Sequence, residues 1–126
     1  MDPRWSRLLA HVERVGHPSL VLAWLHRDEF GPRIAVTLAA GGDSCDFFQV
    51  RGSMAADTAT SPESLVATTT FPQGLRFRQI ILGFHVDGDG SRWLRDSEIS
   101  SGVIAAIDEP KGTTIVGAVS PWSAHP

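Results

Sequence analysis

Two histidines in this sequence, His26 and His85, are each followed two residues later by an aspartate, Asp28 and Asp87. Imidazole titrates near neutral pH, and a carboxylate that accepts its hydrogen bond orients the ring, so such a pair can exchange protons with a substrate. If the two segments meet in the fold, these residues predict isomerase, cyclase or lyase chemistry on a small hydrophobic molecule. Polar residues also collect at strand ends without a catalytic role, so this is the alternative interpretation.

A second group of residues favours binding. Arg76 and Arg78 alternate with Phe77 in an expected strand, which places both guanidinium groups on one face of the sheet. Arginine is enriched at protein interfaces, and Trp93 and Trp122, which lie outside the clearest strands, are natural anchors for a partner. Nucleic acid is disfavoured, because a sheet that binds single strands needs aromatic and basic side chains on the same face.

The segment Asp87–Glu98 partly imitates a calcium-binding loop, with oxygen-bearing side chains at the first, third, fifth and twelfth positions. However, Arg92 stands where such a loop needs glycine, and Arg95 brings positive charge to the ninth position. We therefore expect a hairpin turn at residues 87–90 and no metal site.

The composition limits the class of protein. The chain has 126 residues, 42% of them hydrophobic and 20% charged, with a formal net charge of −3. These values predict one globular domain over residues 1–126, without a general attraction for polyanions. Cys45 is the only cysteine, so it predicts a buried thiol and a reducing, cytoplasmic location. The chain has no secretory pattern, no apolar run that could cross a membrane and no cofactor motif.

The N-terminal segment predicts a helix over residues 3–15. Asp2 and Pro3 are typical of a helix start, and apolar residues recur after them at spacings of three and four. Gly16 supplies a left-handed closing residue, and the following Pro18 cannot easily continue the helix.

The remaining chain alternates short apolar runs with turn residues, which predicts a curved, mainly antiparallel sheet of six or seven strands over about residues 20–119. We expect a cone or partial barrel, with the first strand central, Trp24 in the core and a bulge near Gln79. A hairpin is expected to turn at Glu109–Gly112. The expected strands are 20–27, 33–40, 45–51, 65–71, 75–86, 103–108 and 113–119. Residues 52–64 predict either a lid or a mobile loop, and residues 120–126 predict a fraying tail.

Together these observations favour a non-enzymatic binding module, an N-terminal helix packed on a sheet that engages a protein partner or a second copy of itself. The surface would combine the two sheet arginines with exposed tryptophans. The alternative is a cofactor-independent acid–base enzyme, or a ligand-binding protein, with an apolar cavity lined by His26, His85 and Asp87.

Overall fold

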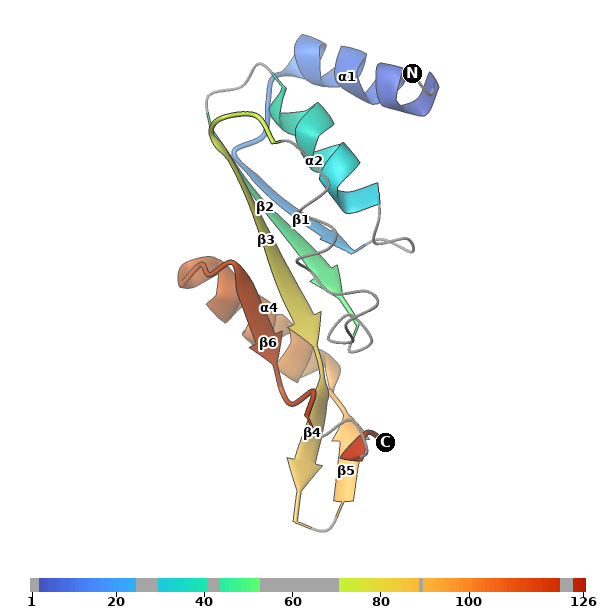
Figure 1. Ribbon diagram of the computed structural model, residues 1–126, viewed down its shortest axis with the longest axis vertical. Coiled ribbons are helices and arrows are strands. Elements are labelled where there is room, and N and C mark those ends of the chain that lie inside the picture. The colour runs from blue at the N-terminus through green and yellow to red at the C-terminus, as the bar shows by residue number, and fades with distance from the viewer. Residues whose placement is uncertain (1–2, 25–29, 41–43, 53–70, 89, 121–123) are drawn as a thin grey trace.

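The computed structural model describes residues 3–24, 30–40, 44–52, 71–88, 90–120 and 124–126 (Figure 1). The elements are α1 (Pro3–Val15), β1 (Leu20–Trp24), α2 (Phe30–Ala39), β2 (Cys45–Arg51), β3 (Leu75–Leu82), β4 (Phe84–Asp87), β5 (Gly90–Trp93), α4 (Asp96–Asp108) and β6 (Thr113–Val116). Among the described helices, none has both the length and the apolar character that a membrane span requires.

Helix α1 forms over the residues that the sequence predicts. Gly16 ends it with a φ of 104°, and its amide donates a hydrogen bond of 2.8 Å to the carbonyl of Val12. Val12 is 3% exposed, and α1 packs on α2. Helix α1 is therefore tied to the rest of the fold through another helix.

The sheet differs from the prediction. Its main part has four strands in the order β1-β2-β3-β6, and every neighbouring pair is parallel. Among the described strands, only β4 and β5 pair antiparallel, as a separate two-stranded sheet. The prediction of a curved, mainly antiparallel sheet of six or seven strands is wrong, because two of the expected strands are helices that carry the chain back between parallel strands.

Helix α2 replaces the strand predicted over residues 33–40. The alternation of apolar residues there suggests a strand, but the buried residues Gly31, Pro32, Ala35 and Ala39 share one helical face. Their small side chains allow a close approach to the sheet: a Cβ on Gly31 would lie 1.8 Å from Oε1 of Gln49 in β2. Thr37 Oγ1 also donates to the carbonyl of Arg33, four residues earlier, which fits helical geometry.

Helix α4 replaces the strand predicted over residues 103–108. Val103 and Ala106 are buried, and Ile99 and Ile107 pack beside them. These positions have the three-and-four spacing of a helix, but the apolar residues within 103–108 alone also fit a strand. Glu109 ends the helix by donating its amide to the carbonyl of Ala105. Residues 109–112 therefore connect a helix to a strand, and the predicted hairpin at this position is wrong.

The long strand predicted over residues 75–86 is divided at Gly83 into β3 and β4. A Cβ at Gly83 would lie 2.1 Å from the carbonyl oxygen of Ala118, so a side chain does not fit there. The change of apolar phase needs no bulge at Gln79, because both faces of the sheet are buried at that end. The hairpin of β4 and β5 turns between Asp87 and Gly90, as predicted, and extends beyond the main sheet (Figure 1).

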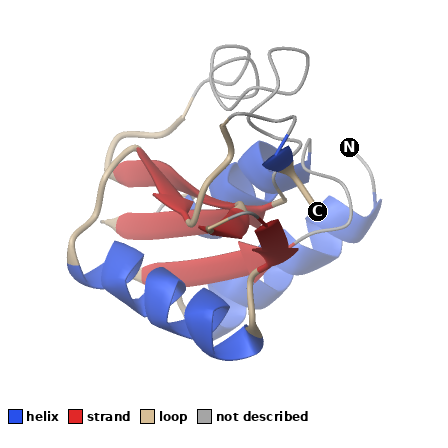
Figure 2. Cartoon of the chain, turned by 90° about the horizontal axis from the view of Figure 1, so that it is seen from below, coloured by secondary structure: helices blue, strands red, loops and turns tan. Residues whose placement is uncertain are grey.

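The two faces of the main sheet are covered by different helices (Figure 2). On one face Gln49 meets α2. The other face packs its apolar residues on Val103 and Ala106 of α4; these sheet residues are Phe48, Val50, Ile80 and Leu82. Strand β1 is an edge of the described sheet rather than its centre, and the internal strands are β2 and β3.

Candidate interaction surface

The two predicted sheet arginines leave the same face of β3. Arg76 and Arg78 are separated by Phe77, whose ring faces the opposite side and stacks on Phe47 at a centroid distance of 5.4 Å. This is the face that α4 covers further along the strands. The predicted anchor Trp93 lies instead on the β4–β5 hairpin, where its ring contacts Phe84 edge-on at 6.4 Å. Trp122 and His26 lie outside the described residues.

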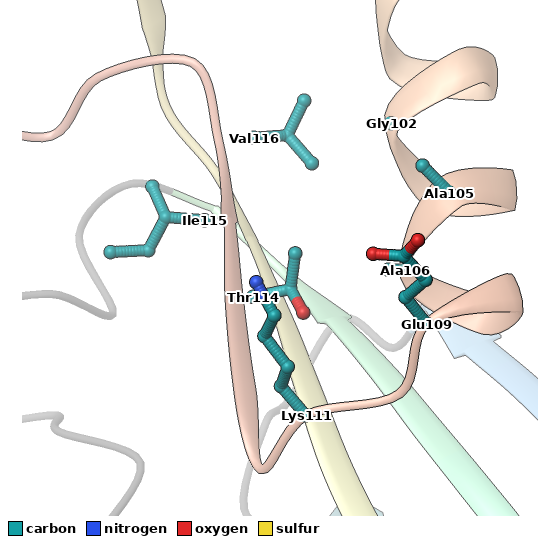
Figure 3. A pocket seen from close by; sticks show the side chains of 8 residues that line it. All are labelled: Gly102, Ala105, Ala106, Glu109, Lys111, Thr114, Ile115 and Val116. Atoms are coloured by element: carbon teal, nitrogen blue, oxygen red, sulfur yellow. The ribbon is translucent and has the colours of Figure 1, made fainter.

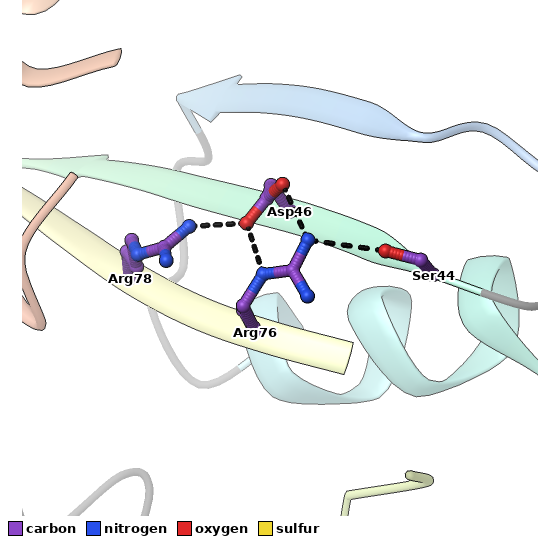
Figure 4. Close-up of polar contacts among 4 residues, drawn as sticks. All are labelled: Ser44, Asp46, Arg76 and Arg78. Atoms are coloured by element: carbon purple, nitrogen blue, oxygen red, sulfur yellow. Dashed lines mark hydrogen bonds and ion pairs between the residues drawn. The ribbon is translucent and has the colours of Figure 1, made fainter. Parts of the chain in front are cut away.

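Both arginines bind one carboxylate, Asp46 of β2 (Figure 4). Arg76 donates from Nε to Oδ1 of Asp46 at 2.7 Å and from Nη2 to Oδ2 at 2.9 Å. The same Nη2 donates to Oγ of Ser44 at 3.0 Å, and Arg78 Nη1 donates to Oδ1 of Asp46. The bidentate contact between Arg76 and Asp46 fixes the plane of the Arg76 guanidinium.

The arginines also control the charge of this cluster. The hydrogen bond from Arg76 is the largest cause that lowers the pKa of Asp46 from 3.8 to about 2. Asp46 therefore stays ionised at neutral pH, and the cluster of two guanidinium groups and one carboxylate carries one net positive charge. Asp46 in turn helps burial to raise the pKa of the neighbouring Cys45 thiol, which makes Cys45 a poor nucleophile.

Three large apolar side chains of β1 lie on the same face as this cluster. Leu20 is 50% exposed, Leu22 is 51% exposed and Trp24 is 64% exposed. In the register of the sheet, Leu20 is level with Asp46, and Trp24 is level with Val50. We call the six residues of this region the open face; they are Leu20, Leu22, Trp24, Asp46, Arg76 and Arg78.

The prediction that Trp24 belongs to the core is wrong. Residues 20–24 are apolar on both faces, so the sequence indicates a buried strand, but β1 lies at the sheet edge. The sequence contains no local signal for this exposure, because it depends on which strand ends the sheet. Trp24 is the functional candidate that the sequence analysis missed.

Arg78 connects the charged and apolar parts of the open face. Its guanidinium carbon lies 5.6 Å from the centroid of the Phe48 ring, and its side chain is 18% exposed. Phe48 is 2% exposed and is level with Leu22 on the neighbouring strand. The arginine therefore covers an aromatic ring that continues the apolar row begun by Leu22.

The predicted catalytic residues are arranged differently. His85 of β4 is opposite Arg92 of β5, and its Nδ1 lies 4.0 Å from Oε2 of Glu98 in α4. Among the described residues, no hydrogen bond or ion pair joins His85 to Asp87, which is exposed at the hairpin turn. The predicted partner of His85 is thus replaced by Glu98.

Glu98 is already committed to other partners. Arg92 donates to both of its carboxylate oxygens, at 2.7 and 3.2 Å, and the amide of Arg95 donates to Oε1 at 2.8 Å. These hydrogen bonds lower the pKa of Glu98 from 4.5 to about 2, and the bond from Arg92 has the largest effect. Glu98 therefore caps the start of α4 and stays ionised, so it has no proton to give at neutral pH.

A pocket of about 280 Å³ lies between α4 and β6 (Figure 3). Its lining is mostly small or apolar, with Glu109, Lys111 and Thr114 as the polar members; the other members are Gly102, Ala105, Ala106, Ile115 and Val116. Among the described residues that line it there is neither a histidine nor an aspartate, so these residues do not form the cavity that the acid–base alternative requires. The pocket also lies at the opposite edge of the sheet from β1.

One further arginine is buried. Arg51, at the end of β2, is 1% exposed and donates to Oε1 of Gln79 at 2.9 Å. It occupies the face that carries Gln49, opposite to Arg76 and Arg78, because it is an odd number of residues from Asp46 on the same strand. Arg51 is therefore not part of the open face.

The chain matches no protein-family model, and comparisons with curated proteins and with solved structures gave no significant match.

Proposed function

We propose that this protein is a non-enzymatic binding module that engages another protein surface through the open face. The observation that carries this proposal is the exposure of Leu20, Leu22 and Trp24 side by side on one strand. Exposed large apolar residues that adjoin one another on a folded domain are typical of interaction sites. Trp24 is the expected anchor, because tryptophan contributes disproportionately to the free energy of binding.

The chemistry of the open face also suits association. Complete burial of a large apolar side chain is worth about 1.5–3 kcal/mol, so hiding the exposed halves of three such side chains contributes on the order of 3 kcal/mol. Arg76 and Arg78 share the carboxylate of Asp46, which compensates one of their two positive charges, so burying the cluster against another protein costs less than burying two unpaired arginines. The open face therefore combines an apolar centre on β1 with a polar border on β3.

The acid–base alternative receives no comparable support. In the described part of the chain, Nδ1 of His85 lies 4.0 Å from a carboxylate that Arg92 binds, which is too far for a hydrogen bond that would orient the ring, and the pocket lies elsewhere. The cytoplasmic location remains part of the proposal and rests on the single cysteine, which is buried as a free thiol.

Affinity capture tests this proposal. The protein is immobilised and exposed to an extract of the cells that produce it, beside the variants Trp24→Asp and Arg76→Glu/Arg78→Glu. The matched control is Ile104→Asp, which places the same charge at another exposed apolar position, 59% exposed on α4. We expect the open-face variants to reduce retention of specific proteins, including added tagged wild-type chain, by about tenfold while the control does not. Equal retention by all four proteins would remove the open face as the binding surface.

A further inference from the structure

We infer that the open face binds a second copy of this chain, with the two β1 strands paired antiparallel about a two-fold axis at Leu22. This inference rests on the proposed function and identifies its partner. It follows from the backbone direction of β1, from the composition of the strand and from the register of its neighbours.

Among the described strands, β1 has a neighbour on one side only, and its other edge presents its hydrogen-bonding groups at the residues whose side chains are exposed. The carbonyl of Ser19 accepts from the amide of Asp46 at 2.9 Å, and Leu20 is the register partner of Asp46. In a parallel pair, alternate residues bond to the neighbouring strand, so the backbone groups of Ser19 and Val21 face β2. Those of Leu20, Leu22 and Trp24 consequently face away from the sheet, toward an incoming strand.

The residues of β1 themselves carry none of three features that prevent edge-to-edge pairing. Monomeric proteins protect an edge strand with charged residues, proline or a bulge. The five residues of β1 are Leu-Val-Leu-Ala-Trp, without charge or proline, and their register with β2 is continuous. Such an edge can pair with a strand of another chain.

The sequence of β1 is self-complementary about Leu22. In an antiparallel pair centred there, Leu22 faces Leu22 of the second copy, and Leu20 faces Trp24 at both ends. All three levels put an apolar side chain beside an apolar side chain on the same face. The central level continues into Phe48 on each side, and the Arg78 of each copy covers that ring. The two sheets would thus join into one sheet of eight strands, with a continuous apolar row across the axis.

A second copy fits this edge better than an unrelated extended peptide, because the symmetric arrangement satisfies both copies at once. It covers two Trp24 side chains and two sheet edges in one contact, and like surfaces meet as a closed two-fold interface requires. The charged clusters do not oppose it, since Arg76 and Asp46 lie on β3 and β2, behind β1.

Sedimentation equilibrium over a range of protein concentrations tests the inference. We expect the wild-type mass to approach twice 13.6 kDa as the concentration rises. Leu22→Arg would place two arginines opposite each other on the axis, and we expect it to weaken the dimer by about a hundredfold. The control Ile104→Arg is expected to dimerise as the wild type does, and circular dichroism checks that each variant is folded.

Disulfide trapping tests the register. Leu20→Cys and Trp24→Cys proteins, when mixed and oxidised, are expected to form a covalent heterodimer, because paired residues of antiparallel strands have Cα atoms within the range that a disulfide spans. Each of the two alone, and a mixture of Leu20→Cys with Ile104→Cys, should cross-link far less. The native Cys45 does not interfere, because it is buried.

The outcomes separate this inference from the proposed function. A wild-type chain that stays monomeric at every concentration overturns the inference. If Trp24→Asp nevertheless abolishes the capture of another protein, the proposed binding function still stands. A dimer that persists in Leu22→Arg also overturns the inference, because it forms through another surface. If, in addition, capture is unaffected by the open-face variants, the proposed function fails as well.

Discussion

Trp24 and Val50 are register partners on adjacent parallel strands, and their side chains leave the same face of the sheet, yet Trp24 is 64% exposed and Val50 is 3% exposed. The difference arises because Val50 belongs to the cluster that packs on α4, whereas Trp24 lies on the edge strand beyond that helix. One sheet face thus changes from core to open surface between two neighbouring strands.

This contrast predicts different costs for two truncations. Val50→Ala removes buried methyl groups and leaves a cavity, so it should lower the free energy of unfolding by about 2 kcal/mol. Trp24→Ala should cost the isolated chain less than about 1 kcal/mol, because most of its side chain is already in water. Urea denaturation at low protein concentration, where association does not contribute, measures both values. A larger loss for Trp24→Ala than for Val50→Ala would contradict the exposure of the open face.

The ion pairs of Asp46 predict an acid-sensitive part of the stability. Because the folded pKa of about 2 lies below the ordinary value of 3.8, the stabilisation is complete above about pH 4 and is lost as the pH falls through about 2. After allowance for partial exposure to solvent, this contribution is about 1 kcal/mol. Asp46→Asn should therefore be less stable than the wild type at pH 7 and should lose less stability on acidification. Unfolding measured from pH 7 to pH 2 tests this, and parallel curves for the two proteins would show that the ion pairs do not contribute.

Gly83 predicts a steric effect that depends on backbone rather than side chains. A Cβ there would lie 2.1 Å from the carbonyl oxygen of Ala118, which is fixed by a hydrogen bond to the amide of Phe84. Gly83→Ala should therefore lower the free energy of unfolding by about 2 kcal/mol or more. Gly112→Ala is the control, because no atom lies within 4 Å of its added Cβ. Similar melting temperatures for Gly83→Ala and Gly112→Ala would contradict the close contact between Gly83 and the carbonyl of Ala118.

Cys45 predicts slow chemical modification. Its thiol is 1% exposed, and burial raises its pKa, so the reactive thiolate is scarce in the folded state. A disulfide reagent at pH 8 should label the native protein at least about a hundredfold more slowly than the urea-unfolded protein. Because Cys45 is the only cysteine, the reaction follows one site. Rapid labelling of the folded protein would indicate that the start of β2 opens to solvent.

Glu98 predicts an unusual titration. The hydrogen bonds from Arg92 and from the amide of Arg95 lower its pKa from 4.5 to about 2. Carbon-detected NMR of the carboxyl groups should show a titration midpoint near that value in the wild type and a shift toward 4.5 in Arg92→Gln. A wild-type midpoint near 4.5 would contradict the contact between Glu98 and Arg92.

The features that the sequence determined by itself are local. Pro3 and Gly16 mark the two ends of helix α1 at the residues found in the structure, since helix starts and stops depend on neighbouring backbone groups. The strand Cys45–Arg51 and the turn between Asp87 and Gly90 were predictable for the same reason. The shared face of Arg76 and Arg78 follows from the two-residue period of any strand, whatever its partners are.

Only the tertiary structure decided which elements are neighbours and in which direction they run. Residues 33–40 and 103–108 alternate well enough to suggest strands, because a segment of ten residues or fewer can fit both the helical and the strand period. Once these segments form helices, they return the chain across the sheet and make parallel pairing possible. The tertiary structure also decides the exposure of Trp24. An apolar strand becomes buried or exposed according to whether another strand and a covering helix lie beside it, and these contacts join residues far apart in the chain.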